Sequence, residues 1–533
     1  MVSPEEAMEN LTIDRAHDGF INDEFTTRQL VEYYLHRIRS LNGPLPLAHN
    51  TPGLPNVAGQ PDVYLNAIIS VSDTALDEAD ELDEYLFRFN RWKGLLHGIP
   101  VIVKDSITTA GLRTTFGSSR AANYVPDQDA TVIQNLKKQG AIIIAKSTLP
   151  GGHLPLLVFH CHLLIKLFLD WSASIFCTSS LSGTTRNPHD LGREPSSGTA
   201  AAIAADLAIL GLDTDTDGTI GLSASSCSLV GLRPRPGMVS RHGTAPLILP
   251  QDSLGPICRT VRDAALMYGA MIGFDPQDAL TAYSTVVPTN NRNPTEYFTT
   301  GLGSAHASSL RIGVVNSLFG DNKDPDQYSV NQLVTTALDH LGSAGASLVP
   351  ITIPHLQQWL ITTQLHIYRS QSDLNKFFTK AEPPLNHTVA SLYKENTHHP
   401  AQDLFERIAK GPHPDHDLAY HICLEKHAEF RPLVMSKMRE QNIDLLAFPT
   451  SKVPAPFTAD VLAGKWNSRN FPTNTSLATQ TQLPSISIPV GQTEDGVPVG
   501  ITLVASMLDE KRLLEAAAAV EDEVDGRIIP RFP

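Results

Sequence analysis

The fold is decided by the stretch Arg193-Glu-Pro-Ser-Ser-Gly-Thr-Ala-Ala-Ala-Ile-Ala-Ala-Asp206 together with Leu210-Gly-Leu-Asp-Thr-Asp-Thr-Asp-Gly-Thr-Ile220. In the first segment a loop of small residues opens into an Ala-rich helix, so backbone N–H groups point at whatever lies above Ser196. In the second, an apolar strand ends in a turn of Asp, Thr and Gly that can present successive amides to an oxyanion. Composition alone equally fits two loops that only cap a helix and a strand.

Helices and strands alternate on both sides of this stretch. Hydrophobic spacing and turn residues predict helices at 27–40 (N-cap Thr26), 73–89, 130–139, 326–344 and 509–524, and strands at 101–103, 141–145, 309–315, 347–351, 484–491 and 499–505. Residues 356–440 are typical of a polar, helical region that faces the substrate. Since no repeat or linker marks a boundary, we predict one large α/β domain over residues 1–533, with a core of about 26–524 and a central mixed β-sheet flanked by helices.

Charge and composition exclude several classes of function. The chain has 41 Lys+Arg against 56 Asp+Glu, a formal net charge of −15, which disfavours binding to nucleic acid or to an anionic membrane. Its five Cys are scattered, as is typical of a reducing compartment. The acidic N-terminus does not resemble a secretory signal, so a cytoplasmic location is expected. The composition is also compatible with a homodimer.

One apolar block does not fit the surrounding pattern. Residues 154–169 read LPLLVFHCHLLIKLFL, which is shorter than a membrane-spanning helix and is interrupted by two His and one Lys. We interpret residues 151–169 as an insertion, and a retained intron translated in frame would explain it. A membrane-surface cap or a buried core helix is the alternative.

Several ordered motifs carry a resemblance to a known family. They are Leu96-His-Gly-Ile-Pro-Val-Ile-Val-Lys-Asp105, Pro126-Asp-Gln-Asp-Ala-Thr-Val132, Lys146-Ser-Thr-Leu149, the opening stretch, Asp252-Ser-Leu-Gly-Pro256, and Pro489-Val-Gly with Pro498-Val-Gly. With them the chain resembles the amidase signature family, of the fungal acetamidase-like type, over nearly its whole length. The resemblance implies hydrolysis of a small-molecule amide by a Ser–cis-Ser–Lys triad without metal or cofactor.

Carried onto this sequence, the triad falls on Lys104 as base, Ser196 as relay and Thr219 as nucleophile. Lys104 ends a run of β-branched apolar residues, as burial of a catalytic lysine requires. Without the resemblance, a lysine that is solvated or paired with a neighbour such as Asp105 is the plainer interpretation. Oxyanion and substrate contacts are expected from Ser197, Thr216, Asp217 and Gly218.

The signature departs from the family pattern at the site itself. Thr219 stands where the family has Ser, and Asp217 stands where it has Gly, so a carboxylate would oppose the oxyanion unless it points away. The loop before Gly198 lacks the family's glycines and is two residues short. Counted back from Gly198 the relay position falls on Pro195, whereas a shortened loop places it on Ser196, which we favour over Ser197. A catalytically impaired family member is therefore the main alternative, and a subunit of an amidotransferase is a less favoured one.

Overall fold

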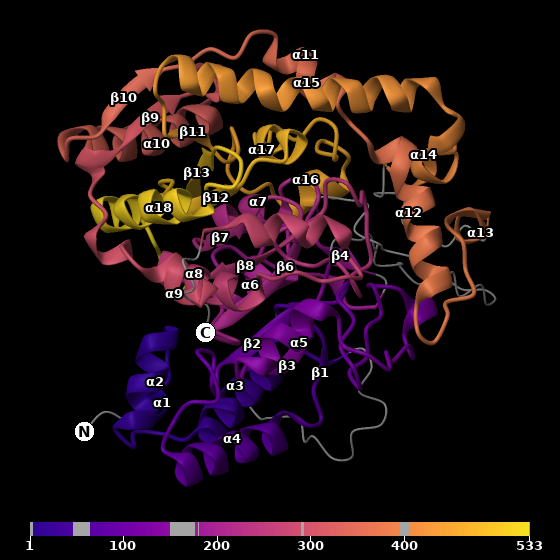
Figure 1. Ribbon diagram of the computed structural model, residues 1–533, viewed down its shortest axis with the longest axis vertical. Helices are drawn as coiled ribbons and strands as arrows, with labels where there is room; N and C mark the ends of the chain where they lie inside the picture. The colour runs from indigo at the N-terminus through magenta and orange to yellow at the C-terminus, as the bar shows by residue number, and fades with distance from the viewer. Residues whose placement is uncertain are drawn as a thin grey trace.

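The computed structural model describes residues 4–45, 64–149, 176–179, 181–288, 293–394 and 404–531. Its main sheet has 11 strands in the order β1-β3-β2-β6-β8-β7-β12-β13-β11-β9-β10 (Figure 1). The strands are β1 Ile68–Val71, β2 Pro100–Lys104, β3 Ile142–Ser147, β6 Leu210–Asp215, β7 Val230–Arg233, β8 Ser253–Cys258, β9 Arg311–Val314, β10 Ser347–Pro350, β11 Leu445–Pro449, β12 Ser485–Gln492 and β13 Pro498–Ala505. A separate two-stranded sheet pairs β4 Thr178–Ser179 with β5 Gly183–Thr184.

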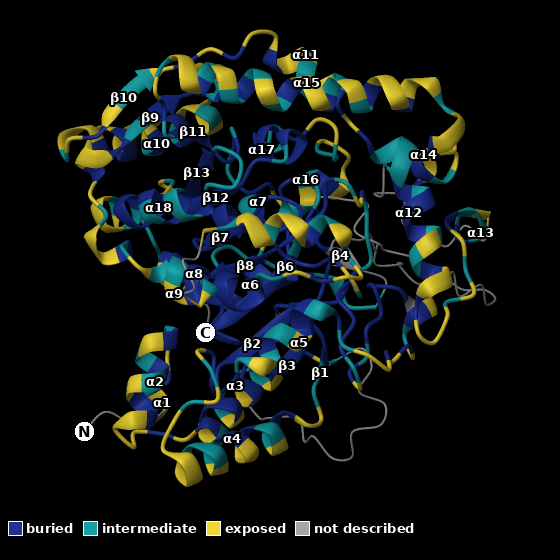
Figure 2. Ribbon diagram, viewed as in Figure 1, coloured by how far each residue is buried: buried dark blue, intermediate teal, exposed yellow. Residues whose placement is uncertain are grey.

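The main sheet contains both parallel and antiparallel pairs, which confirms the mixed sheet expected from the sequence. Strand β2 runs parallel to both β3 and β6, whereas β6 is antiparallel to β8. At the other end, β9 is parallel to β10 and β11, and β13 is antiparallel to β11 and β12. Most strands of the sheet are buried, whereas the edge strand β10 is partly exposed, and outer helices such as α4 and α15 carry exposed faces (Figure 2).

Helices flank the sheet throughout the described part of the chain. They are α1 Pro4–Ala7, α2 Ile13–Ile21, α3 Thr27–Leu41, α4 Ala75–Phe89, α5 Thr131–Lys138, α6 Gly198–Ala204, α7 Thr219–Ser226, α8 Val261–Met271, α9 Pro294–Thr299, α10 Pro325–Ser343, α11 Leu356–Thr362, α12 His366–Lys380, α13 Val389–Lys394, α14 Phe405–Ala409, α15 Leu418–Glu440, α16 Thr458–Leu462, α17 Ser476–Thr481 and α18 Glu510–Val524. In α3, Thr26 and Gln29 form a complete capping box, so the predicted start of this helix is confirmed.

Of two regions singled out in the sequence, the structure describes most of one and none of the other. Residues 356–440 are helical as predicted in their described parts, which contain α11 to α15; in Figure 1, α11 and α15 run across the top and α12, α13 and α14 lie at the right. The apolar block 151–169 lies outside the described residues. Among the described helices, none is both long enough and apolar enough to cross a membrane.

Candidate active site

The loop before α6 carries two buried serines, Ser196 and Ser197. Ser196 is buried and has a φ of 64°, a left-handed conformation that is uncommon outside glycine. Ser197 caps α6, because its hydroxyl accepts a hydrogen bond from the Thr199 amide at 3.1 Å. A Cβ at position 198 would lie 2.0 Å from the Thr148 hydroxyl oxygen, so only glycine fits there. These contacts fix where the serine loop enters the helix.

Lys104, the last residue of β2, and Asp213 of the neighbouring parallel strand β6 form a buried ion pair. Because Val103 of β2 pairs with Leu212 of β6, the next residue on each strand meets at the same edge of the sheet. The Lys104 Nζ lies 2.6 Å from Asp213 Oδ1, with side chains 1% and 0% exposed. The ammonium also donates a hydrogen bond to the Thr214 carbonyl at 3.3 Å. The partner of Lys104 is therefore Asp213, and the plainer expectation of a pair with Asp105 was wrong.

Asp213 extends this pair to the serine loop. Its second carboxylate oxygen accepts a hydrogen bond from the Ser197 hydroxyl, so Lys104, Asp213 and Ser197 form a continuous chain of polar contacts. The serine in contact with the Lys104 pair is thus Ser197, whereas the sequence favoured Ser196 as the relay. Asp213 was not singled out from the sequence, although its place two residues before Asp215 on the same strand face could have suggested it.

A second buried lysine lies on the neighbouring strand. Lys146 of β3 is fully enclosed, and burial lowers its pKa to about 8 in spite of the nearby charge of Asp105. Its ammonium donates to the Ile107 carbonyl and to the hydroxyls of Thr109 and Thr114 at 3.4 and 3.3 Å. All three acceptors belong to the segment after β2, so Lys146 holds that segment against the sheet.

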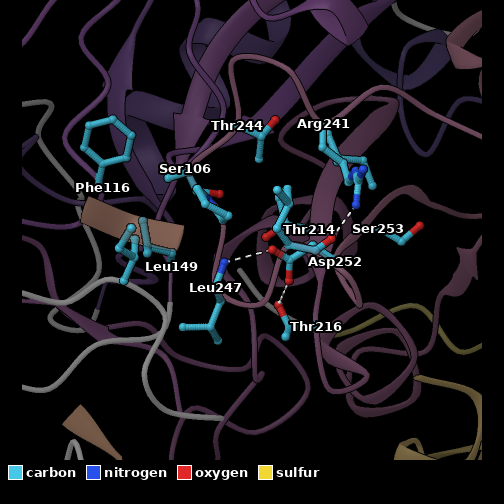
Figure 3. Close-up of a pocket in the computed structure, with 15 residues that line it drawn as sticks. Ser106, Phe116, Leu149, Thr214, Thr216, Arg241, Thr244, Leu247, Asp252 and Ser253 are labelled. Atoms are coloured by element: carbon cyan, nitrogen blue, oxygen red, sulfur yellow. Dashed lines mark hydrogen bonds between the residues drawn. The ribbon is translucent and has the colours of Figure 1, made fainter. Parts of the chain in front are cut away.

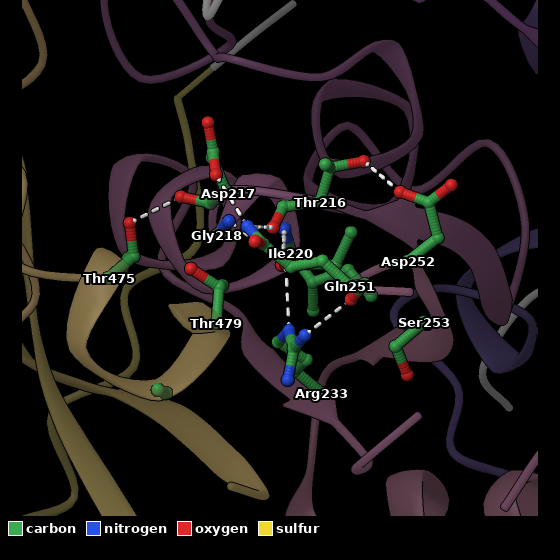
Figure 4. Close-up of polar contacts among 12 residues, drawn as sticks. Thr216, Asp217, Gly218, Ile220, Arg233, Gln251, Asp252, Ser253, Thr475 and Thr479 are labelled. Carbon is green, nitrogen blue, oxygen red and sulfur yellow. Dashed lines mark hydrogen bonds and ion pairs between the residues drawn. The ribbon is translucent and has the colours of Figure 1, made fainter. Parts of the chain in front are cut away.

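The turn after β6 is held by Asp215. Its carboxylate accepts hydrogen bonds from the Gly218 and Ile220 amides at 2.9 Å each and is paired with the buried Arg233 at 3.0 Å (Figure 4). Gly218 has a φ of 100°, and a Cβ there would lie 2.0 Å from that of Thr475. The Gly218 amide is thus used by Asp215, which corrects the expectation that it would face an oxyanion.

The Asp217 carboxylate contacts polar groups from two other parts of the chain. Its carboxylate lies 2.6 Å from Nε2 of His366, at the start of α12, and accepts a hydrogen bond from the Gln251 amide at 2.8 Å. Burial acts to raise the pKa of Asp217, but the charge and hydrogen bond of His366 outweigh it and lower the pKa. Burial acts to lower the pKa of His366, and Asp217 raises it above its ordinary value. The carboxylate that the sequence places beside the nucleophile position is therefore paired with His366, whose protonated form it favours.

Thr216 and its neighbours complete the turn. The Thr216 hydroxyl donates to Asp252 at 2.6 Å, and its carbonyl accepts from Gln251 at 2.7 Å. Burial raises the pKa of Asp252 to about 6, although the Thr216 hydroxyl and two backbone amides hydrogen-bond its carboxylate. Thr216 is thus fixed on both its side chain and its backbone (Figure 4). Gln251 and His366 lie in no motif, and Asp252 begins the motif Asp252–Pro256 but was given no role, so sequence reasoning missed all three as site residues.

Thr219 is the first residue of α7 and is partly exposed. Within the described residues its hydroxyl makes no hydrogen bond to Lys104 or Ser197, and no group of His, Cys, Asp and Glu side chains is arranged to hold a metal ion. The described contacts therefore give a partly accessible hydroxyl at the start of α7 and, apart from it, a closed chain of Lys104, Asp213 and Ser197.

Comparison with known proteins identifies the family. The mixed sheet flanked by helices, the serine loop and the buried Lys104–Asp213 pair define an α/β fold with an enclosed polar site. The amidase family model matches residues 60–155 and 167–514, and the chain belongs to this family. Among curated relatives, a glutamyl-tRNA(Gln) amidotransferase subunit of Microcystis aeruginosa is 29% identical over 525 residues, covering 96% of this chain and 98% of that protein. The subunit of the same name from Trichodesmium erythraeum is 31% identical over 445 residues, with coverages of 80% and 84%.

Solved structures agree with this membership. Native peptide amidase from Stenotrophomonas maltophilia superposes with a TM-score of 0.80 at 27% identity, covering 98% of this chain and 99% of that chain. The complex of the peptide amidase PAM with chymostatin superposes with a TM-score of 0.81. Both support the predicted single α/β architecture. The fungal acetamidase-like type remains a prediction from the motifs.

Proposed function

We propose that the protein hydrolyses a neutral carboxylic acid amide to the acid and ammonia or an amine, with Thr219 as the acyl-accepting hydroxyl. Membership of the amidase family and the partly exposed Thr219 at the start of α7 support this assignment. The Thr219 oxygen would bond to the amide carbon, the C–N bond would break, and the departing nitrogen would take up the proton. Water would then release the acid and restore the hydroxyl.

The observation that shapes the proton path is the contact between Asp213 and both Lys104 and Ser197. An ammonium has no lone pair and cannot accept a proton, whereas the Asp213 carboxylate can. We place Asp213 as the acceptor, Lys104 as the cation that holds it, and Ser197 as the hydroxyl in contact with it. Ser196 remains the alternative relay, since it precedes Ser197 in the same loop.

A second candidate function follows from the same ion pair. With Lys104 held as an ammonium by Asp213, the base that the family mechanism needs is absent, and the protein would bind an amide without turning it over. The relatives named as amidotransferase subunits support a third candidate, release of ammonia from glutamine for transfer within a complex. The three candidates predict different results in an assay of ammonia release.

Ammonia release distinguishes the three candidates. Benzamide, propionamide and L-glutamine are offered to the unmodified chain, to Thr219→Ala and to Thr285→Ala, which removes an exposed hydroxyl as a matched control. The proposal expects ammonia from a neutral amide that is lost in Thr219→Ala and kept in Thr285→Ala. Ammonia from glutamine alone favours the amidotransferase candidate. Binding with no ammonia from any amide favours the impaired enzyme and rejects the proposal.

We also propose that residues 151–169 are an insertion into the family fold. The two ranges matched by the family model leave out residues 156–166, which supports this proposal. Sequencing of the mature transcript tests the intron origin, because messages that keep these codons would reject it.

A further inference from the structure

A groove lies between the C-terminal half of α15 and the turn that joins β13 to α18. Its volume is about 640 Å³, which is within the range of small-molecule pockets. A different cleft adjoins the turn that carries Thr219 and is lined by residues such as Thr214, Thr216 and Asp252 (Figure 3). Among the described residues the groove and this cleft share no lining residue, so the groove is a separate candidate site.

The floor of the groove is apolar and rich in methionine. Met438 and Ile443 are buried in the core, and the half-buried Met435 and Met507 pack against the same core cluster. Methionine side chains are flexible and polarisable, so they adapt to apolar groups of different shapes. The floor therefore favours a ligand with an apolar side chain.

One wall of the groove carries an excess of positive charge. Arg439, in the last turn of α15, is exposed and has no ion pair or hydrogen bond within the described part of the chain. Arg431 donates a hydrogen bond to the side-chain oxygen of Gln482 at 2.9 Å, a neutral partner that leaves the guanidinium charge uncompensated. The nearby carboxylate of Glu440 is paired with Lys437 at 2.7 Å. This wall can therefore accept a carboxylate.

The opposite wall carries an excess of negative charge. Asp444 and Asp509 both line the groove, and Asp444 lies 3.5 Å from the guanidinium of Arg512. The same guanidinium lies 3.9 Å from Glu515, and of these three carboxylates only Glu515 has a further cationic side-chain partner among the described residues, Lys511 at 3.2 Å. Burial raises the pKa of Asp509, Arg512 opposes this shift, and Glu515 and Asp444 add to it. A ligand cation would relieve this crowding of carboxylates.

We propose that this groove binds zwitterionic amino acids or short peptides with apolar side chains. The ligand carboxylate pairs with Arg439, its ammonium pairs with Asp509, and its side chain covers the methionine floor. A ligand with a single charge leaves one wall uncompensated, and a polar side chain loses hydrogen bonds to water against the floor. The proposal goes beyond amide hydrolysis and does not rest on it, because the groove is separate from the turn that carries Thr219.

Calorimetric titration at low ionic strength tests the proposal, since salt screens exposed charges. Four ligands are titrated into the unmodified chain: L-leucine, leucyl-leucine, isocaproate, which lacks the ammonium, and isoamylamine, which lacks the carboxylate. The zwitterions are then titrated into Arg439→Gln, Asp509→Asn and the control Arg39→Gln. Arg39 is a matched control because it is also an exposed arginine in the last turn of a helix, α3, and does not line the groove.

The expected result is that at least one zwitterion binds, and that isocaproate and isoamylamine bind at least about tenfold more weakly, because each lacks one charge-assisted interaction. Arg439→Gln and Asp509→Asn each weaken the zwitterion about three- to tenfold, and Arg39→Gln leaves its affinity unchanged. Tighter binding of L-leucine identifies free amino acids as the ligands, and tighter binding of leucyl-leucine identifies short peptides.

Three kinds of result would overturn the proposal. They are no binding of either zwitterion at millimolar concentration, equal affinity for isocaproate or isoamylamine, and an affinity that is unchanged in either groove variant or is equally weakened in Arg39→Gln. The comparison of the four ligands uses the unmodified chain, so it decides the matter even where a variant does not fold. Ammonia release plays no part in these measurements, so a failure of the proposed function leaves their outcome unaffected.

Discussion

Replacement of Asp213 by Asn should destabilise the fold strongly, because it leaves the Lys104 ammonium buried without a counter-charge. At 2.6 Å and an effective dielectric constant of about 20, two unit charges attract by about 6 kcal/mol. The Asn side chain keeps one oxygen for the ammonium, so part of this interaction survives. We expect a loss of about 3–5 kcal/mol in the free energy of unfolding.

A double-mutant cycle isolates the interaction. Lys104→Met alone leaves a buried carboxylate without a counter-charge, whereas Lys104→Met combined with Asp213→Asn removes both charges. The double variant should therefore lose much less free energy of unfolding than the sum of the losses of the two single variants. The exposed pair Lys465–Asp460, with side chains 58% and 35% exposed at 2.7 Å, is the matched control. Asp460→Asn should cost less than about 1 kcal/mol.

Urea unfolding followed by tryptophan fluorescence at pH 7 and pH 10 measures these costs. The cost of Asp213→Asn should shrink at pH 10, because the lysine of the unfolded chain is then increasingly neutral and folding no longer has to bury a charge. A double variant that loses as much as the two single variants together would refute the reasoning, and so would a single-variant loss as small as that of Asp460→Asn.

Two other predictions concern pH. Because the pKa of His366 is raised and that of Asp217 is lowered, their pair stabilises the fold between about pH 4 and 6.5, and this is lost as pH rises through the pKa of His366 or falls through that of Asp217. We expect His366→Gln to cost about 1 kcal/mol in this window and little at pH 9 in thermal melts, and an equal cost at both pH values would contradict the ion pair. Burial raises the pKa of Glu194 from 4.5 to about 7, so its contribution is present below pH 4.5 and is lost as pH rises to 7. Glu194→Gln should remove up to ~3 kcal/mol of this pH dependence in the same melts, and an unchanged pH profile would show that Glu194 is not its source.

Local patterns were enough to predict most of the sheet and its helices. The run Val101–Val103 became the centre of β2, and the helix predicted at 326–344 is α10 at Pro325–Ser343. Such elements follow from apolar periodicity and capping residues, which act over a few positions. The site depends on contacts that no local pattern encodes.

Asp213 and His366 illustrate this limit. Asp213 reads as one more polar residue at a strand end, and only the parallel register of β2 and β6 brings it against Lys104. His366 lies 149 positions after Asp217, since 366 − 217 is 149, and the sequence offers no spacing rule that would join them. Sequence reasoning singled out Asp217 as a charge beside the nucleophile position, but its partner His366 comes from another region of the chain.

The contact between Gly218 and Thr475 has a consequence for how the protein is made. The Thr475 hydroxyl donates to the Asp217 carbonyl across 258 positions, and its side chain fills the space above Gly218. During synthesis on a ribosome, the turn that carries Thr219 must wait for the last tenth or so of the 533 residues before this support exists. A nascent or truncated chain that ends before Thr475 would lack the support, so the site completes only when the chain is nearly finished.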